Sequence, residues 1–178
     1  DEKDKVRKTV EDILREIEKI VEDLVRRNER VDREIRERVR ELLRRDDEIL
    51  KRMEEVKRRR APEEVLEEIA ERLRRSSEEV LKLIRELIRR LKETVKDAER
   101  LIRELIKRLA EVVDTARKEG VEEREVTKLK EDIDRLLEKL ERDLDELRKR
   151  NDELLKELED RVRKSKEKVE KILRDVRR

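Results

Sequence analysis

Apolar residues recur along this chain at a spacing of 18 residues, separated by stretches of charged ones. The spacing is found in each third of the sequence, for example in Ile13, Val31 and Ile49; in Leu83 and Leu101; and in Leu136, Leu154 and Ile172. Eighteen residues are five turns of an α-helix with 3.6 residues per turn. A heptad period would coil helices left-handed and an 11-residue period right-handed, so this period predicts straight helices.

Two short segments interrupt the helical pattern. Pro62 marks the first, because proline is tolerated in the first turn of a helix and breaks a helix interior. Gly120 follows a basic stretch and is typical of a helix C-cap. We therefore predict helices over residues 2–59, 62–118 and 122–177, each about 85 Å long at the rise of an α-helix.

The near-equal lengths of these helices and their short connections define the expected fold class. Short connections make successive helices antiparallel neighbours. The sequence thus predicts an all-α protein, a long antiparallel up-down-up three-helix bundle with straight helices. Residues 1–178 are expected to form this bundle as a single domain.

A rotation of about 100° per residue gathers the apolar side chains of the first and third predicted helices on one face each. The members of these faces are Ile13, Ile17, Val21, Leu24, Ile35, Leu42, Ile49 and Met53 in the first helix, and Ile133, Leu140, Leu144, Leu147, Leu158, Val169 and Val176 in the third. Faces of this width suit a helix that contacts two neighbours.

The second predicted helix has a broader apolar face. It is centred near Ile84 and extends to Val65, Leu83 and Leu101 at one edge. We interpret the extra width as a surface that covers both neighbouring helices. The alternative is an exposed apolar edge, which would support self-association.

Seven polar residues fall on or beside these apolar faces. With turns near residues 61 and 121, antiparallel pairing places them at two heights, Asn28, Thr94 and Asn151 at one and Asp46, Ser76, Ser77 and Ser165 at the other. A buried polar group without a partner costs about 1–3 kcal/mol, so members of one layer are expected to hydrogen-bond to each other. Such layers would fix helix register, because a slip along the 18-residue repeat would leave them unpaired.

A catalytic or ligand-binding pocket is the alternative interpretation of the same residues. Asp46 has no His or Lys base on its apolar face, and an Asn/Thr/Asn set contains no nucleophile–base pair. We therefore expect no catalytic residue and assign the seven polar residues a structural role.

The amino-acid composition argues against several classes of partner and cofactor. Charged residues make up 61% of the chain, yet the formal net charge is only +2, and acidic and basic residues are interspersed. This argues against a nucleic-acid or membrane-surface partner, which requires a basic face. The absence of His and Cys argues against a transition-metal site, and one glycine cannot form a phosphate-binding loop. We expect no cofactor and no metal.

Several features together resemble one known class of protein. They are the 18-residue repeat, the Ala-Pro-Glu-Glu helix start at residues 61–64, the single Gly120 cap, a Leu/Ile/Val core without aromatics and the level-matched polar residues. In these the chain resembles computationally designed, untwisted three-helix bundles and helical bundles with designed buried hydrogen-bond networks. The resemblance implies high stability and no evolved activity.

The expected function is accordingly that of a de novo structural scaffold, not an enzyme, with no natural biochemical activity. We expect a soluble monomer without partners, and no cellular compartment is indicated. The main alternative is an interaction module in which the broad face of the second helix pairs with a second copy or with a partner. An amphipathic lipid binder whose helices open on a membrane is a further alternative.

Overall fold

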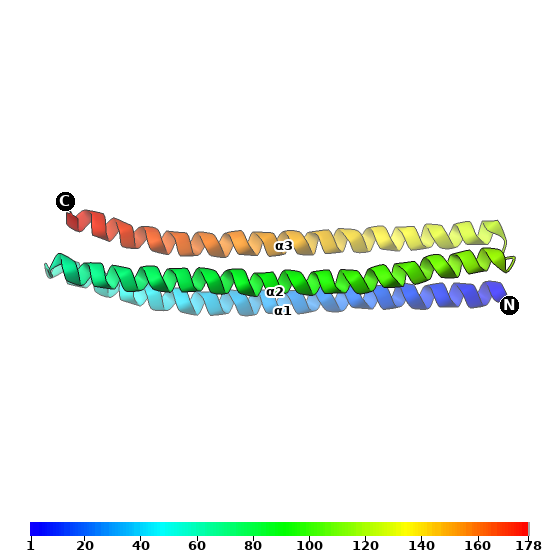
Figure 1. Ribbon diagram of the computed structural model, residues 1–178, viewed down its shortest axis with the longest axis horizontal. Helices are drawn as coiled ribbons and strands as arrows, with labels where there is room; N and C mark the ends of the chain where they lie inside the picture. The colour runs from blue at the N-terminus through cyan, green and yellow to red at the C-terminus, as the bar shows by residue number, and fades with distance from the viewer. Residues whose placement is uncertain (178) are drawn as a thin grey trace. The chain divides into compact units, whose positions relative to one another are not determined.

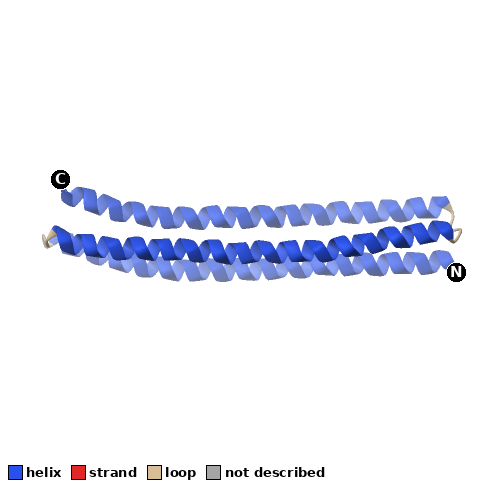
Figure 2. Cartoon of the chain, in the orientation of Figure 1, coloured by secondary structure: helices blue, strands red, loops and turns tan. Residues whose placement is uncertain are grey.

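The computed structural model describes residues 1–177, and this range folds into three α-helices: α1 (Glu2–Arg58), α2 (Glu63–Lys118) and α3 (Glu123–Arg177). Two short loops connect them, and no strand occurs in the described range (Figure 2). Successive helices run in opposite directions (Figure 1). The predicted all-α three-helix fold is confirmed, and each predicted helix boundary lies within one residue of the observed one.

The helix ends carry charges that suit the helix dipole. Acidic Glu63 and Glu64 lie in the first turn of α2, and basic Arg117 and Lys118 lie in its last turn. Backbone N–H groups give a helix N-terminus a partial positive charge and carbonyl groups give the C-terminus a negative one. The end charges therefore favour helix initiation after Pro62 and termination before Gly120.

Gly120 ends α2 in the way its position predicts. Its φ of 87° lies in the left-handed region, where a Cβ atom is unfavourable. The Val121 N–H donates to the Ala116 carbonyl at 3.0 Å, and the Gly120 N–H donates to the Arg117 carbonyl at 3.2 Å. These two bonds form a Schellman motif, which satisfies carbonyl groups that the helix end leaves unpaired.

The first turn repeats this motif with an arginine in place of the glycine. The Ala61 N–H donates to the Val56 carbonyl at 3.2 Å and the Arg60 N–H to the Lys57 carbonyl at 3.0 Å. Arg60 has a φ of 55°. The sequence predicted a break here from Pro62 but gave no sign that Arg60 adopts the left-handed conformation, which costs an L-residue about 1–2 kcal/mol.

The chain divides into two compact units, and each contains segments of all three helices. Unit 1 comprises Asp1–Glu29 and Leu91–Arg150, and unit 2 comprises Arg30–Arg90 and Asn151–Arg178. The expectation that residues 1–178 form a single domain stays a prediction.

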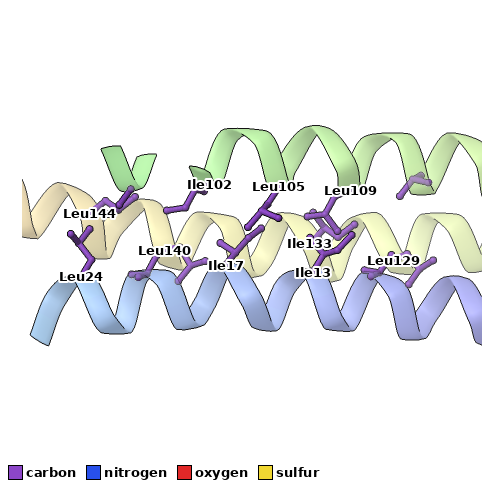
Figure 3. Close-up of a cluster of buried hydrophobic side chains, with 14 of the residues drawn as sticks. Ile13, Ile17, Leu24, Ile102, Leu105, Leu109, Leu129, Ile133, Leu140 and Leu144 are labelled. Carbon is purple, nitrogen blue, oxygen red and sulfur yellow. The ribbon is translucent and has the colours of Figure 1, made fainter. Parts of the chain in front are cut away.

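Unit 1 has a core made from apolar faces of α1, α2 and α3. Ile13 and Ile17 of α1, Leu105 and Leu109 of α2, and Ile133 of α3 point into the same interior (Figure 3). Ile17 is fully buried and Leu109 is 2% exposed. Full burial of such a side chain contributes about 1.5–3 kcal/mol, so this face holds the three segments together.

Unit 2 has its own apolar cluster near the first turn. It is formed by Leu50, Met53, Leu66, Ala70, Leu73, Val169, Ile172 and Leu173. Met53 and Ala70 are fully buried, so the sole methionine of the chain fills an interior position between helices.

Most of the side chains predicted to face the interior are buried, with exceptions at the margins. Leu42, Ile49 and Val176 are half-buried, while Val39 and Leu50 occupy buried positions on α1. On α2, Val65 is 39% and Leu101 is 55% exposed. Our interpretation that the broad edge of α2 covers its neighbours is therefore wrong at these two residues.

Ion pairs join the helices at the surface of each unit. In unit 1, Arg148 of α3 donates to Glu99 of α2 at 2.6 Å. In unit 2, the Arg74 guanidinium donates to both carboxylate oxygens of Glu170, at 2.8 and 3.2 Å. Exposed pairs of this kind contribute about 0.2–1 kcal/mol each, which is less than one buried leucine.

The two turns lead to a matched pair of stability predictions. Gly120→Ala should lower the free energy of unfolding by about 1 kcal/mol, because alanine disfavours the left-handed backbone conformation of this residue. Steric clash adds nothing to this loss, since an added Cβ at Gly120 meets no atom within 4 Å. Arg60→Gly should raise it by about 0.5–1 kcal/mol, because the left-handed strain is relieved. Guanidinium denaturation measures both effects. Arg59→Gly is the control, and equal stability of Arg60→Gly and Arg59→Gly would contradict the prediction.

Candidate buried polar site

In unit 2, α1 and α2 bring two of the predicted polar residues into contact. The Ser76 hydroxyl of α2 donates a hydrogen bond of 2.7 Å to Oδ1 of Asp46 of α1. Asp46 is 3% exposed, and Ser76 is half-buried. The contact arises because both residues lie on the apolar faces of antiparallel helices at one height, as the register predicted.

The second carboxylate oxygen of Asp46 is in a different situation. Oδ2 is buried and has no hydrogen-bond partner among the described residues. Ser77 is 2% exposed and Ser165 is half-buried. The predicted layer of Asp46, Ser76, Ser77 and Ser165 therefore contains one observed pair, and its other links stay a prediction.

The choice between the two serines depends on direction as well as height. Neighbouring residues on a helix point about 100° apart, so Ser76 and Ser77 face different parts of the bundle. The sequence placed Ser77 at the centre of the apolar face and Ser76 near its edge. The residue at the edge is the one that bonds to Asp46.

Burial is the main influence on the ionisation of this carboxyl. Burial raises the pKa of Asp46 above its ordinary value of 3.8, the hydrogen bond from Ser76 lowers it, and the neighbouring Asp47 carboxylate raises it again. The net effect is a raised pKa, because the ionised carboxyl loses more solvation free energy on burial than the one hydrogen bond from Ser76 restores.

The other predicted layer is divided between the two units. Asn28, 3% exposed, and half-buried Thr94 belong to unit 1, whereas fully buried Asn151 belongs to unit 2. None of these three residues is without a partner. Burial of the two amides agrees with their positions on the apolar faces, and the joint layer stays a prediction.

The described residues present no further chemistry at these positions. Asp46 is the only ionisable residue in the buried set of residues 1–177. Over the same range, no three His, Cys, Asp or Glu residues cluster closely enough to hold a metal ion. None of the described helices combines the length and apolar character needed to cross a membrane.

A groove that the sequence did not reveal lies between α1 and α3 of unit 1. Its volume is about 480 Å³, and Val21, Val25, Leu140 and Leu147 contribute its apolar lining. Charged residues also line it, and one of them, Arg150, pairs with Glu29 at 3.5 Å. Short valine side chains on α1 are the available sequence signal, but the pattern of apolar positions does not show how much space they leave.

Comparisons with known proteins add little to this picture. No protein-family model matches the chain, and no curated protein matches it. One solved structure to which the chain is similar is described as a "Computationally designed three helix bundle"; the match covers 98% of this chain and 90% of the other, with 16% identity and a TM-score of 0.45.

The hydrogen bond to Asp46 generates a stability prediction. Ser76→Ala should lower the free energy of unfolding at pH 7 by about 1–2 kcal/mol, because it leaves both buried carboxylate oxygens without a donor. Denaturant titration followed by circular dichroism measures the loss. Ser165→Ala is the matched control and should change stability by less than about 0.5 kcal/mol. Equal losses in the two variants would show that the Ser76 bond has no special role.

Proposed function

We propose that this protein is a computationally designed structural scaffold whose function is to adopt one defined three-helix fold. It has no natural biochemical activity and requires no cofactor. One observation carries the proposal: the buried carboxyl of Asp46 receives its hydrogen bond from a serine. A general acid or base needs a reactive partner or access to substrate, and a buried Asp–Ser pair between two helices provides neither.

The buried polar residues are proposed to fix helix register in this scaffold. Apolar residues that repeat every 18 positions can pack equally well after a slip of one repeat. A slip of one repeat would separate Asp46 from Ser76; it would bring Asp46 level with Thr94, or Ser76 level with Asn28, and would leave the other member of the pair without its partner. The free-energy cost of such unpaired groups disfavours the alternative registers.

Substitutions in the other predicted layer test this role. Asn28→Leu or Asn151→Leu alone should lower the free energy of unfolding by about 1–3 kcal/mol, because each strands the remaining polar groups. The triple variant with Asn28→Leu, Thr94→Val and Asn151→Leu should recover most of that loss, since no unpaired group remains. Denaturation of the triple variant and of all three single variants, Thr94→Val included, gives the interaction energy. Additive losses would overturn the proposal that these residues form one network.

A second candidate function is a self-associating interaction module. It is favoured by one specific observation, the exposure of Leu101 and Val65 on the broad edge of α2. Transfer of a large exposed aliphatic side chain from water into an interface is favourable, so a partner that covered these two residues would be stabilised on binding. Each side chain has a charged residue directly before it in the sequence, Glu64 before Val65 and Arg100 before Leu101, which reduces the continuous apolar area. We therefore place the monomeric scaffold first.

Size-exclusion chromatography with light scattering separates the two functions. The scaffold predicts a mass near 22.0 kDa that does not change with concentration. The interaction module predicts at least twice that mass, reduced to the monomer by Leu101→Glu. Glu104→Gln, on the same helix, is the control that leaves the apolar edge intact. A dimer insensitive to Leu101→Glu would exclude the broad edge of α2 as the interface.

A further inference from the structure

Asp46 combines deep burial with incomplete hydrogen bonding. It is 3% exposed, Oδ1 accepts one bond of 2.7 Å from Ser76, and Oδ2 has no partner in the described range. An ionised carboxylate has about four acceptor sites and normally fills several of them when it is buried. One hydroxyl donor is a small compensation for the loss of water around a full charge.

The surroundings supply little charge of opposite sign. On α1 the exposed residues Arg45 and Asp47 adjoin Asp46; of the two, the Asp47 carboxylate acts on its ionisation, because it repels a charge on Asp46. The register places Ser76 and Ser77 of α2 at this height, with Leu73 and Val80 one turn away. Arg74 of α2 is engaged with Glu170 of α3.

On α3 the same height corresponds to Ser165 and half-buried Lys166. Lys166 is the basic residue on this side, and it is not among the groups that shift the pKa of Asp46. Neither α2 nor α3 therefore compensates a negative charge at this position.

We propose that Asp46 is a proton-dependent stability element of unit 2: folding favours the protonated form of its buried carboxyl over the ionised form, and its ionisation weakens the fold. The neutral carboxyl requires no counter-charge, and Oδ1 can still accept the Ser76 hydrogen bond. Ionisation would create a buried negative charge that has one hydrogen-bond donor, Ser76, and, among the described residues, no cation paired with it. The polar pair that fixes register thus also makes the stability of the fold depend on pH.

The direction of the pH dependence follows from proton linkage. In the unfolded chain Asp46 titrates near its ordinary value of 3.8, and burial raises the pKa in the folded state. Between these two pKa values the folded state binds one more proton than the unfolded state. The stabilisation is fully present below the unfolded-state pKa and is lost as the pH rises through the folded-state pKa.

Asp46→Asn tests the proposal because an amide mimics the neutral carboxyl. The unfolding equilibrium constants of the full chain and of this variant would be measured by guanidinium denaturation between pH 3 and 8. The ratio of wild-type to variant constant should rise with pH above about 4, by up to tenfold per pH unit, and then level off. Asp47→Asn removes the exposed neighbouring charge and is the matched control. It should lack a rise of this size, and a ratio for Asp46→Asn that stays flat or falls with pH would overturn the proposal.

A direct titration tests the proposal even if Asp46→Asn does not fold. The carboxyl ¹³C shift of Asp46 in the wild-type protein should titrate above 3.8, whereas a midpoint at or below that value would overturn the proposal. Ser76→Ala removes the hydrogen bond that lowers the pKa, so its midpoint should move further upward. A downward movement in Ser76→Ala would show that the hydroxyl does not act on the charged form, and would also contradict the proposed arrangement.

Discussion

Burial of one apolar face per helix against two neighbours is the constraint on which the rest of this structure depends. Each helix is more than 50 residues long, and mainly Leu, Ile, Val and Ala on one face of it contact the neighbouring helices. A single buried leucine such as Leu109 contributes about 1.5–3 kcal/mol, whereas an exposed pair such as Arg100–Asp97 contributes at most about 1 kcal/mol. The charged majority of the sequence therefore supports helix formation, and the apolar minority determines how the helices pack.

The same constraint leaves a problem that aliphatic side chains cannot solve. After a shift of 18 residues, a neighbouring helix again meets Leu, Ile or Val at the same positions. Packing alone therefore distinguishes the registers poorly. Hydrogen bonds are directional, which is why we propose that the buried Asp46 carboxyl and its one donor, Ser76, distinguish the registers. The free-energy cost arises at Asp46, because its buried Oδ2 has no hydrogen-bond partner in the described range. In the proposed scaffold, register specificity and a buried acid with incomplete hydrogen bonding thus have one origin.

Sequence reasoning predicted the helices to within one residue because Pro62 and Gly120 act through local backbone geometry. It also placed Asp46 and Ser76 at one height, since height depends only on residue count. It did not predict that Ser76 rather than Ser77 donates to Asp46, because that depends on side-chain direction between two helices. The exposure of Leu101 was missed for a related reason: a rotation angle on one helix does not say how far its neighbours reach around it.

The two turns show how local and tertiary effects can lead to the same geometry. At Gly120 the left-handed conformation is what the residue itself permits, so local preference and the Schellman hydrogen bonds agree. At Arg60 the same pair of bonds forms against the residue's own preference. The strain of about 1–2 kcal/mol is offset by burial of residues close to the turn, among them Met53 and Leu66. The conformation of the first turn is thus imposed by the packing of α1 against α2, while that of the second is already favoured by its sequence.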